Sequence, residues 1–304
     1  MRKSDRHLEE ALEDYNRKVE EYEENGTNEQ LLEAYVNRGC VLSMMDSFIS
    51  AMTDFDDAEE IMDIMGSLGE KVDAGTYVKA YVSRGEIQTS DGAAGMAEDY
   101  ATASERLDDL NSSSRHFDQR GIVKMCISCA EDLLDEGYPG NLEPFIVKAE
   151  KMLFDKNDTW SKNRYVEALN LMGQAEHEMG RKEESLHYYD RSISVCQELM
   201  GENSLDDEMA LIFALVSRGD LEVEDESFED AVRDYEAAIA ILEVMLSFHR
   251  PETRELLMQV HREVSEVLMG MNESGEAEKH LLRALELNIG KAAVKFAEDD
   301  EEHP

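Results

Sequence analysis

The sequence predicts an all-α protein built from repeated pairs of antiparallel helices. Small residues recur at positions 39, 85, 121, 173, 219 and 265, spaced by 46, 36, 52, 46 and 46 residues. After four of them, a small–large–small pattern follows at distances of 12, 16 and 19 residues. No segment shows the period-two alternation that predicts a half-buried strand. A fixed period of this length indicates an array of similar helical units.

The pattern is clear after Gly39, where the three distances reach Ala51, Phe55 and Ala58. The equivalent sets after Gly173, Gly219 and Ser265 are Ser185, Tyr189 and Ser192; Ala231, Tyr235 and Ala238; and Ala277, Leu281 and Ala284. A small residue on a first helix lets a second helix cross closely. The bulky side chain of the second helix then fills the groove between them.

Two repeats depart from this pattern. The second repeat reaches Tyr100 and Ala103 one residue early. The third has no fit after Gly121, and it matches only if a later segment provides its second helix through Leu142, Ile146 and Ala149. We therefore expect an irregular third repeat.

This arrangement resembles the tetratricopeptide repeat (TPR) family over roughly residues 30–288. Segments 34–61 and 214–241 match best. In the latter the motif positions are Leu215, Gly219, Phe228, Ala231, Tyr235 and Ala238. Spacings of 46 residues exceed the usual TPR length, so we expect longer helices. The resemblance implies an α-solenoid, a right-handed superhelix in which the first helices line a concave wall.

We expect one solenoid domain over residues 1–304. An N-terminal capping helix spans 1–24, where Ala11 and Tyr15 look like a second-helix face. Repeats follow at 27–66, 72–110, 113–154, 159–200, 204–247 and 251–288. A short helix around 291–296 and an acidic tail make up 289–304. Thr27 and Ser204 each begin a capping-box pattern at the start of a first helix.

The chain has 70 acidic and 30 basic side chains and a formal net charge of −40. Such a charge argues against a nucleic-acid binder, which needs a basic surface, and against docking on an anionic membrane. No apolar run approaches the roughly 18 residues of a transmembrane helix. The N-terminus lacks the apolar core of a secretion signal. We therefore expect a cytoplasmic protein.

No motif predicts catalysis, a cofactor or a metal. Cys126 and Cys129 form the one close cysteine pair, and no further ligands stand at zinc-site spacing. We interpret both as small packing residues. A remote alternative is a helical enzyme or metal protein centred on the irregular third repeat.

The resemblance places candidate binding residues on the concave wall, at fixed offsets from each small residue. They are Asn37, Lys79, Ser83, Glu86, Asn170, Gln174, His177, Phe213, Ser217, Asp220, Arg262 and Glu266. Phe213 is either an apolar anchor for a partner or a packing residue under the preceding second helix. The acids Glu86, Asp220 and Glu266 favour a basic ligand, although they can equally serve only to solvate the surface.

The carboxylate clamp by which some TPR proteins grip acidic chaperone tails needs Lys, Asn and Arg on this wall. The matching positions here are Cys40, Glu86 and Ile122, so we expect no binding of such tails.

The leading hypothesis is a non-catalytic scaffold that binds a protein segment, with a basic one favoured, in the concave groove. The alternative is a regulator that senses a peptide or small molecule. The acidic surface can instead reflect solubility or salt adaptation. A homodimer is left open.

Overall fold

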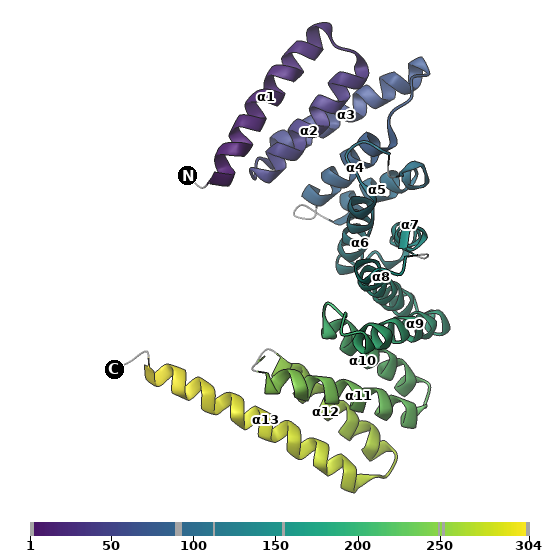
Figure 1. Ribbon diagram of the computed structural model, residues 1–304, viewed down its shortest axis with the longest axis vertical. Coiled ribbons are helices and arrows are strands. Elements are labelled where there is room, and N and C mark those ends of the chain that lie inside the picture. Colours follow the sequence, from purple (N-terminus) through teal and green to yellow (C-terminus); the bar gives the residue numbers. More distant parts are fainter. Residues whose placement is uncertain are drawn as a thin grey trace. The chain divides into compact units, whose positions relative to one another are not determined.

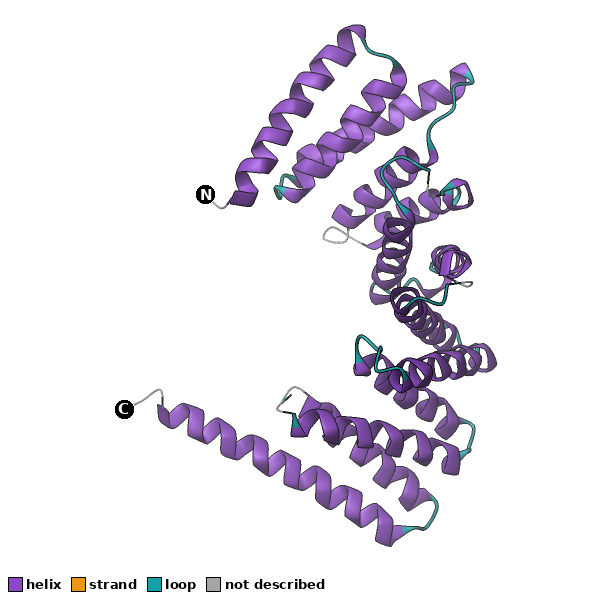
Figure 2. Cartoon of the chain, in the orientation of Figure 1, coloured by secondary structure: helices purple, strands orange, loops and turns teal. Residues whose placement is uncertain are grey.

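The computed structural model describes residues 3–88, 93–111, 113–153, 156–248, 250 and 253–301, and their side chains within 6–289. These residues form α-helices, two short 3-10 helices and connecting turns, and none of them lies in a strand (Figure 2). The expected all-α solenoid class is confirmed. The chain divides into two compact units, residues 1–154 and 155–304, which are described separately. A single domain stays a prediction.

The first unit begins with the long helix α1, which packs on α2 (Figure 1). Its helices are α1 (Lys3–Asn25), α2 (Asn28–Met44), α3 (Phe48–Leu68), α4 (Ala74–Gln88), α5 (Ala93–Ser104), η1 (Leu107–Asp109), α6 (Gln119–Asp135), η2 (Pro139–Asn141) and α7 (Glu143–Leu153). Consecutive helices pair as α2 with α3, α4 with α5 and α6 with α7, as the repeat pattern predicts.

The second unit contains three further pairs, α8 with α9, α10 with α11 and α12 with α13. Its helices are α8 (Thr159–Glu178), α9 (Lys182–Gly201), α10 (Glu208–Glu224), α11 (Phe228–Ser247), α12 (Thr253–Gly270) and α13 (Ser274–Glu301). Helices α8, α9 and α11 have 20 residues each, which agrees with the expected extension. One apolar core runs from Val166 to Leu287 through this unit.

The glycines of the repeat pattern lie where two helices cross most closely. A Cβ atom added to Gly85 would stand 2.5 Å from the ring of Tyr100, and one added to Gly219 would stand 2.8 Å from the ring of Tyr235. Gly39 and Gly173 face Phe55 and Tyr189 in the same way. At these four glycines the small–large rule that the sequence predicted is therefore physical contact, whereas Leu281, the bulky residue expected for the sixth repeat, is 47% exposed.

The third repeat does not use Gly121. That glycine is the third residue of α6, and no aromatic ring of a second helix faces it. The crossing position belongs instead to Ala130, which is fully buried. Counting 12, 16 and 19 residues from Ala130 reaches Leu142, Ile146 and Ala149, all buried. The register then becomes 39, 85, 130, 173, 219 and 265, so the repeat is more regular than the small residues in the sequence suggested.

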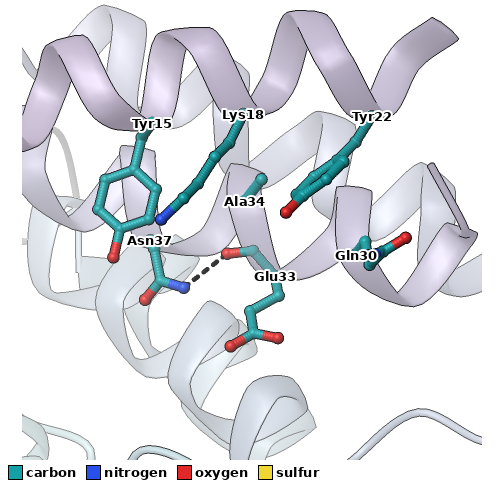
Figure 3. Close-up of a pocket in the computed structure, with 7 residues that line it drawn as sticks. All are labelled: Tyr15, Lys18, Tyr22, Gln30, Glu33, Ala34 and Asn37. Carbon is teal, nitrogen blue, oxygen red and sulfur yellow. Dashed lines mark hydrogen bonds between the residues drawn. The ribbon is translucent and has the colours of Figure 1, made fainter. Parts of the chain in front are cut away.

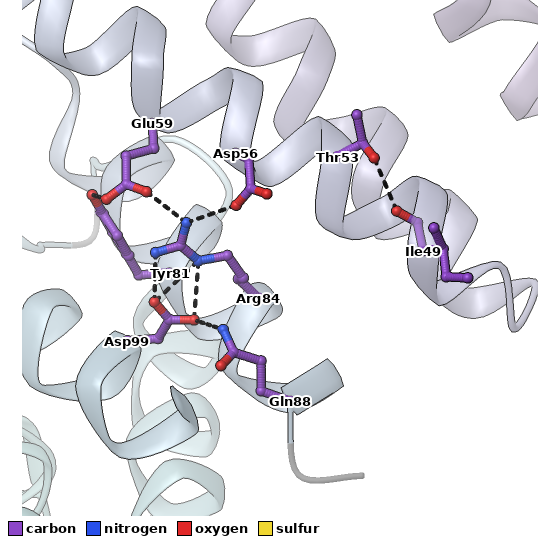
Figure 4. A network of polar contacts seen from close by, with 8 residues as sticks. All are labelled: Ile49, Thr53, Asp56, Glu59, Tyr81, Arg84, Gln88 and Asp99. Atoms are coloured by element: carbon purple, nitrogen blue, oxygen red, sulfur yellow. Dashed lines mark hydrogen bonds and ion pairs between the residues drawn. The ribbon is translucent and has the colours of Figure 1, made fainter. Parts of the chain in front are cut away.

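A second regularity escaped the sequence analysis. The arginine before three of the glycines forms a two-pronged ion pair with the aspartate before the aromatic residue. The pairs are Arg38 with Asp54, Arg84 with Asp99 and Arg218 with Asp234. Arg84 also contacts Asp56 and Glu59 of α3, so it joins three helices (Figure 4).

Three expectations about helix ends have different outcomes. The capping box at Thr27 is confirmed, with both of its hydrogen bonds present. The prediction at Ser204 was wrong, because Asp207 is the residue that caps α10. The separate helix expected around 291–296 was also wrong, since α13 continues unbroken to Glu301. Residues 302–304 of the predicted tail lie outside the described part of the chain.

None of the helices in the described ranges combines the length and apolar character that crossing a bilayer requires.

Candidate binding surface on the first helices

In the first unit, predicted wall residues from two neighbouring first helices meet directly. The Lys79 ammonium donates to Asn37 Oδ1 at 2.8 Å, and the Asn37 amide donates to the carbonyl of Glu33 at 2.7 Å. One turn further on, Cys40 Sγ lies 3.4 Å from Ser83 Oγ. Glu86 continues along α4 and is exposed. The wall of α2 and α4 is therefore polar and cross-linked by its own side chains.

The loop before α6 lies against the beginning of this wall. The Arg115 guanidinium contacts Glu29 at 2.9 Å and Glu33 at 3.1 Å, both on α2. His116 Nε2 lies 3.3 Å from Thr76 Oγ1 on α4. A Cβ atom on Gly75 would stand 2.0 Å from the carbonyl oxygen of Arg115, so only glycine permits this approach. The loop thus places a basic side chain on an acidic pair of the wall.

A shallow pocket of about 190 Å³ lies between α1 and α2, beside the same acidic pair. Tyr15, Lys18 and Tyr22 of α1 lean over it, with Glu33 and Asn37 on the opposite side (Figure 3). Ligand pockets for small molecules usually measure about 300–1,000 Å³. This pocket has room for one side chain of a peptide.

In the second unit, the predicted residues of α8 differ in how accessible they are. Asn170 is buried: its amide donates to the carbonyl of Ala210, and its oxygen accepts from Ser192. This asparagine ties α8 to α9 and α10. Gln174 is half-buried and donates to Glu178 at 3.0 Å, while His177 is exposed.

Phe213 packs against the preceding second helix, which is one of the two roles considered for it, and its role as an anchor for a partner stays a prediction. Its ring contacts the ring of Tyr189 on α9 edge to face, with the centroids 6.1 Å apart. Phe213 nevertheless stays 39% exposed. Ser217, one turn along α10, interacts with the Tyr189 hydroxyl. The ring is therefore anchored on one side and available to a partner on the other.

Three carboxylates of α10 and α12 interact with one another, and one of them, Asp220, also lies near Tyr189. Asp220 accepts the Tyr235 hydroxyl at 2.5 Å. Burial raises the pKa of Glu263, and the neighbouring Asp220 and Glu266 raise it further. Gln259 donates to Oε1 of Glu263. The other carboxylate oxygen, Glu263 Oε2, is buried and has no hydrogen-bond partner among the described residues. Such a group would gain free energy from a cation.

Arg262 and Glu266, the remaining predicted residues, are exposed on α12. Of the twelve predicted residues, the structure brings Asn37, Lys79 and Ser83 together in the first unit. In the second unit it brings Asp220 and Glu266 together around Glu263.

The acidic charge of the chain is not concentrated on the first helices. Helices α2, α4, α6, α8, α10 and α12 together carry a net charge of −6. The second helices α3, α5, α7, α9 and α11 carry −14, and α1 alone carries −5. Half of the net charge on the first helices comes from α10, where Asp220 lies. The acids of α10 are thus a local feature of the wall.

Glu29 and Arg115 were not predicted as site residues. Glu29 and Glu33 are four residues apart on one helix, a spacing that predicts a shared face. Arg115 lies in an irregular loop, and no periodicity predicts its contact with a helix 82 residues away.

The cysteine pair of the third repeat lies in the core. Cys126 and Cys129 are fully buried, and burial raises the pKa of Cys126 to about 12 and that of Cys129 as well. Such thiols stay protonated and unreactive. Within the described ranges, no three side chains of the metal-binding types are close enough to share an ion. Ile122, assigned to the wall by the Gly121 register, is buried in the core.

Comparison with known proteins agrees with this geometry. A tetratricopeptide repeat family model matches residues 166–206, which cover α9 and its flanks. A search of curated protein sequences finds no relative.

Solved structures similar to the chain include BtubC from P. vanneervenii (16% identity, TM-score 0.54, covering 94% of this chain and 92% of that one). Aspartyl phosphate phosphatase F from Bacillus subtilis is another (10% identity, TM-score 0.55, 97% and 76%). The C-terminal part of a TPR protein from Cytophaga hutchinsonii is a third (12% identity, TM-score 0.54, 93% and 95%). At these identities the likeness concerns the fold. The family match over residues 166–206 and the shared fold support a tetratricopeptide repeat protein.

Proposed function

We propose that this protein is a non-catalytic, cytoplasmic scaffold that binds a basic segment of a partner protein on its first helices. The observation that carries the proposal is the group of interacting carboxylates Asp220, Glu263 and Glu266 on α10 and α12, together with the half-exposed ring of Phe213 on α10. A lysine or arginine of the partner would pair with the carboxylates. An apolar neighbour of that residue would pack on Phe213.

Two further features support a protein segment as the ligand. In the first unit, Arg115 forms ion pairs with Glu29 and Glu33. An arginine of a partner would make the same kind of contact with the proposed site. The pocket between α1 and α2 fits a single side chain better than a whole small molecule. A peptide-sensing regulator would use the same contacts. A small-molecule sensor is the alternative, since other pockets of the first unit measure about 320 to 490 Å³.

A titration with a labelled arginine-rich peptide of about 12 residues tests the proposal, with fluorescence anisotropy as the readout. The wall variant carries Asp220→Asn, Glu263→Gln and Glu266→Gln. The matched control removes three exposed acids from second helices through Glu183→Gln, Glu184→Gln and Glu229→Gln. Both variants lose the same charge, so a polycation attracted only by the overall field would respond to them equally.

We expect the wall variant to bind at least 10-fold more weakly at 150 mM salt and the control to stay within about twofold of the wild type. Equal weakening in both variants would show that the peptide senses net charge only, and the proposed site would be wrong.

A further inference from the structure

A stripe of exposed apolar side chains runs along α13. Its members are Leu281 (47% exposed), Leu282 (52%), Leu285 (48%) and Ile289 (69%). Spacings of three and four residues place them on one side of the helix. The other side, which includes Ala284 and Leu287, is buried against α12. A contiguous apolar surface of this kind usually marks an interaction site.

The repeat register shows how unusual this exposure is. Leu281 and Leu285 stand 46 residues after Tyr235 and Ile239 of α11. Helix α11 packs between α10 and α12, and Tyr235 is only 2% exposed. Helix α13 packs against α12 and touches α11 through the ion pair of Arg283 with Glu243. The same helix face is therefore covered in α11 and solvent-exposed in α13.

The charge around the stripe determines which partner it suits. Residues 274–289 carry three acids and two bases, a net charge of −1, in a chain of net charge −40. Two copies of such an acidic chain repel each other over most of their surface. Along this stretch of α13 the repulsion is nearly absent, and a basic partner would find nothing there to attract it.

We propose that α13 pairs with α13 of a second copy, antiparallel and about a twofold axis, to form a homodimer. A twofold interface brings the same patch of each copy together, so the four apolar side chains of one stripe meet the four of the other. The dimer leaves the first helices free, and it does not depend on the peptide-binding function.

Salt separates this interaction from the proposed capture of a basic segment. Salt screens the repulsion between two acidic chains, so the dimer should become tighter as ionic strength rises. Binding of a basic peptide should become weaker over the same range. The two effects have opposite signs and cannot be mistaken for each other.

Sedimentation velocity of the 304-residue chain at 1–100 µM, in 50 and 500 mM NaCl, tests the dimer. We expect the wild type to shift with concentration from its monomer mass of 34.5 kDa to twice that value, and more completely at high salt. Leu281→Glu with Leu285→Glu should stay monomeric throughout. The matched control, Met44→Glu with Ile49→Glu, adds the same charge at exposed apolar positions of the first unit and should still dimerise.

Circular dichroism checks that both variants fold, which is expected because all four substituted residues are exposed. A wild type that stays monomeric at 100 µM in 500 mM NaCl would overturn the proposal. So would a dimer that survives the α13 substitutions or is lost in the Met44 and Ile49 control.

Discussion

At the scale of single residues, the glycines at the helix crossings set how closely each pair packs. Gly85 and Gly219 face aromatic rings at distances that no Cβ atom tolerates. Gly66, also within a helix of the first unit, has nothing within 4 Å of an added Cβ atom. The same substitution should therefore have opposite effects at the two kinds of position.

We predict that Gly85→Ala destabilises the protein by about 1–3 kcal/mol, because the buried Tyr100 must move to accommodate the methyl group. Gly66→Ala should stabilise it by about 0.5–1 kcal/mol through helix propensity alone. Urea unfolding followed by circular dichroism measures both. Equal effects of the two substitutions would contradict the packing described for Gly85.

The arginine–aspartate pairs were only partly predictable from the sequence. Three of the recurring glycines directly follow an arginine, namely Arg38, Arg84 and Arg218. The aspartate partners of these arginines stand 15 or 16 residues away on another helix. Knowing that the residue before each aromatic is an aspartate would have been enough to predict the pairs. Met172 and Val264 take the arginine position in the fourth and sixth repeats, so an apolar residue also fits there.

At the scale of helices and loops, the segment before α6 occupies part of the wall of the first unit, so it would compete with a ligand that binds there. Arg115 is about half-exposed, so its bonds to Glu29 and Glu33 are weak enough to exchange. A partner's arginine would have to displace it.

We predict that Arg115→Ala tightens binding of the arginine-rich peptide about 3- to 10-fold, because Glu29 and Glu33 become free. Adding Glu33→Gln to that variant should cancel the gain. The anisotropy titration described above measures both. An unchanged affinity in Arg115→Ala would mean that the peptide does not use this part of the wall.

Helices α12 and α13 share a buried histidine pair that should make their packing sensitive to acid. His261 Nδ1 and His280 Nδ1 lie 2.9 Å apart, so two protonated rings would face each other donor to donor. Burial, and then the charge of His280, lower the pKa of His261 to about 4, while Glu243 opposes the shift. Burial also lowers the pKa of His280.

In the unfolded chain His261 has its ordinary pKa of about 6.5, so it takes up a proton there at a higher pH than in the folded protein. We predict that the free energy of unfolding is unaffected by His261 above this pH and falls as the pH drops below it, by about 2 kcal/mol at pH 5. Urea unfolding at pH 7.5 and pH 5.0 measures the loss. In His261→Gln the acid-induced loss should be smaller by that amount. Identical losses in the two proteins would rule out the histidine pair as the cause.

The helices were predictable to the extent that their signals are local. Repeat period, capping at Thr27 and the crossing residues of four repeats depend on residues close together in sequence, and each was recovered. The third repeat was misplaced because Ala130 is one of many alanines, whereas Gly121 follows an arginine as three true crossing residues do. The contact of Arg115 with α2 depends on tertiary packing, which no local pattern encodes.

At the scale of the whole molecule, the net charge of −40 acts mainly through the second helices and loops. Helices α1, α3 and α11 carry net charges of −5, −6 and −4. Self-repulsion of this size destabilises the folded state, and salt relieves it.

We therefore predict that the melting temperature rises by several degrees between 20 and 500 mM NaCl. The second-helix variant with Glu183→Gln, Glu184→Gln and Glu229→Gln should show a smaller rise, because part of the repulsion is already gone. Differential scanning calorimetry gives both values. A melting temperature that is flat or falls with salt would mean that ion pairs such as that of Arg84 outweigh the repulsion.

Site-specific photo-crosslinking in an extract of the source organism tests the central claim, that partners bind on the first helices, most directly. A photoreactive residue replaces Phe213 or Glu266 on the wall, and Glu229 or Phe248 on α11 and its end as controls. The account predicts that the same basic protein is trapped from both wall positions and released by 500 mM salt before irradiation. Trapping of that protein from the control positions, with none from Phe213 and Glu266, would contradict it.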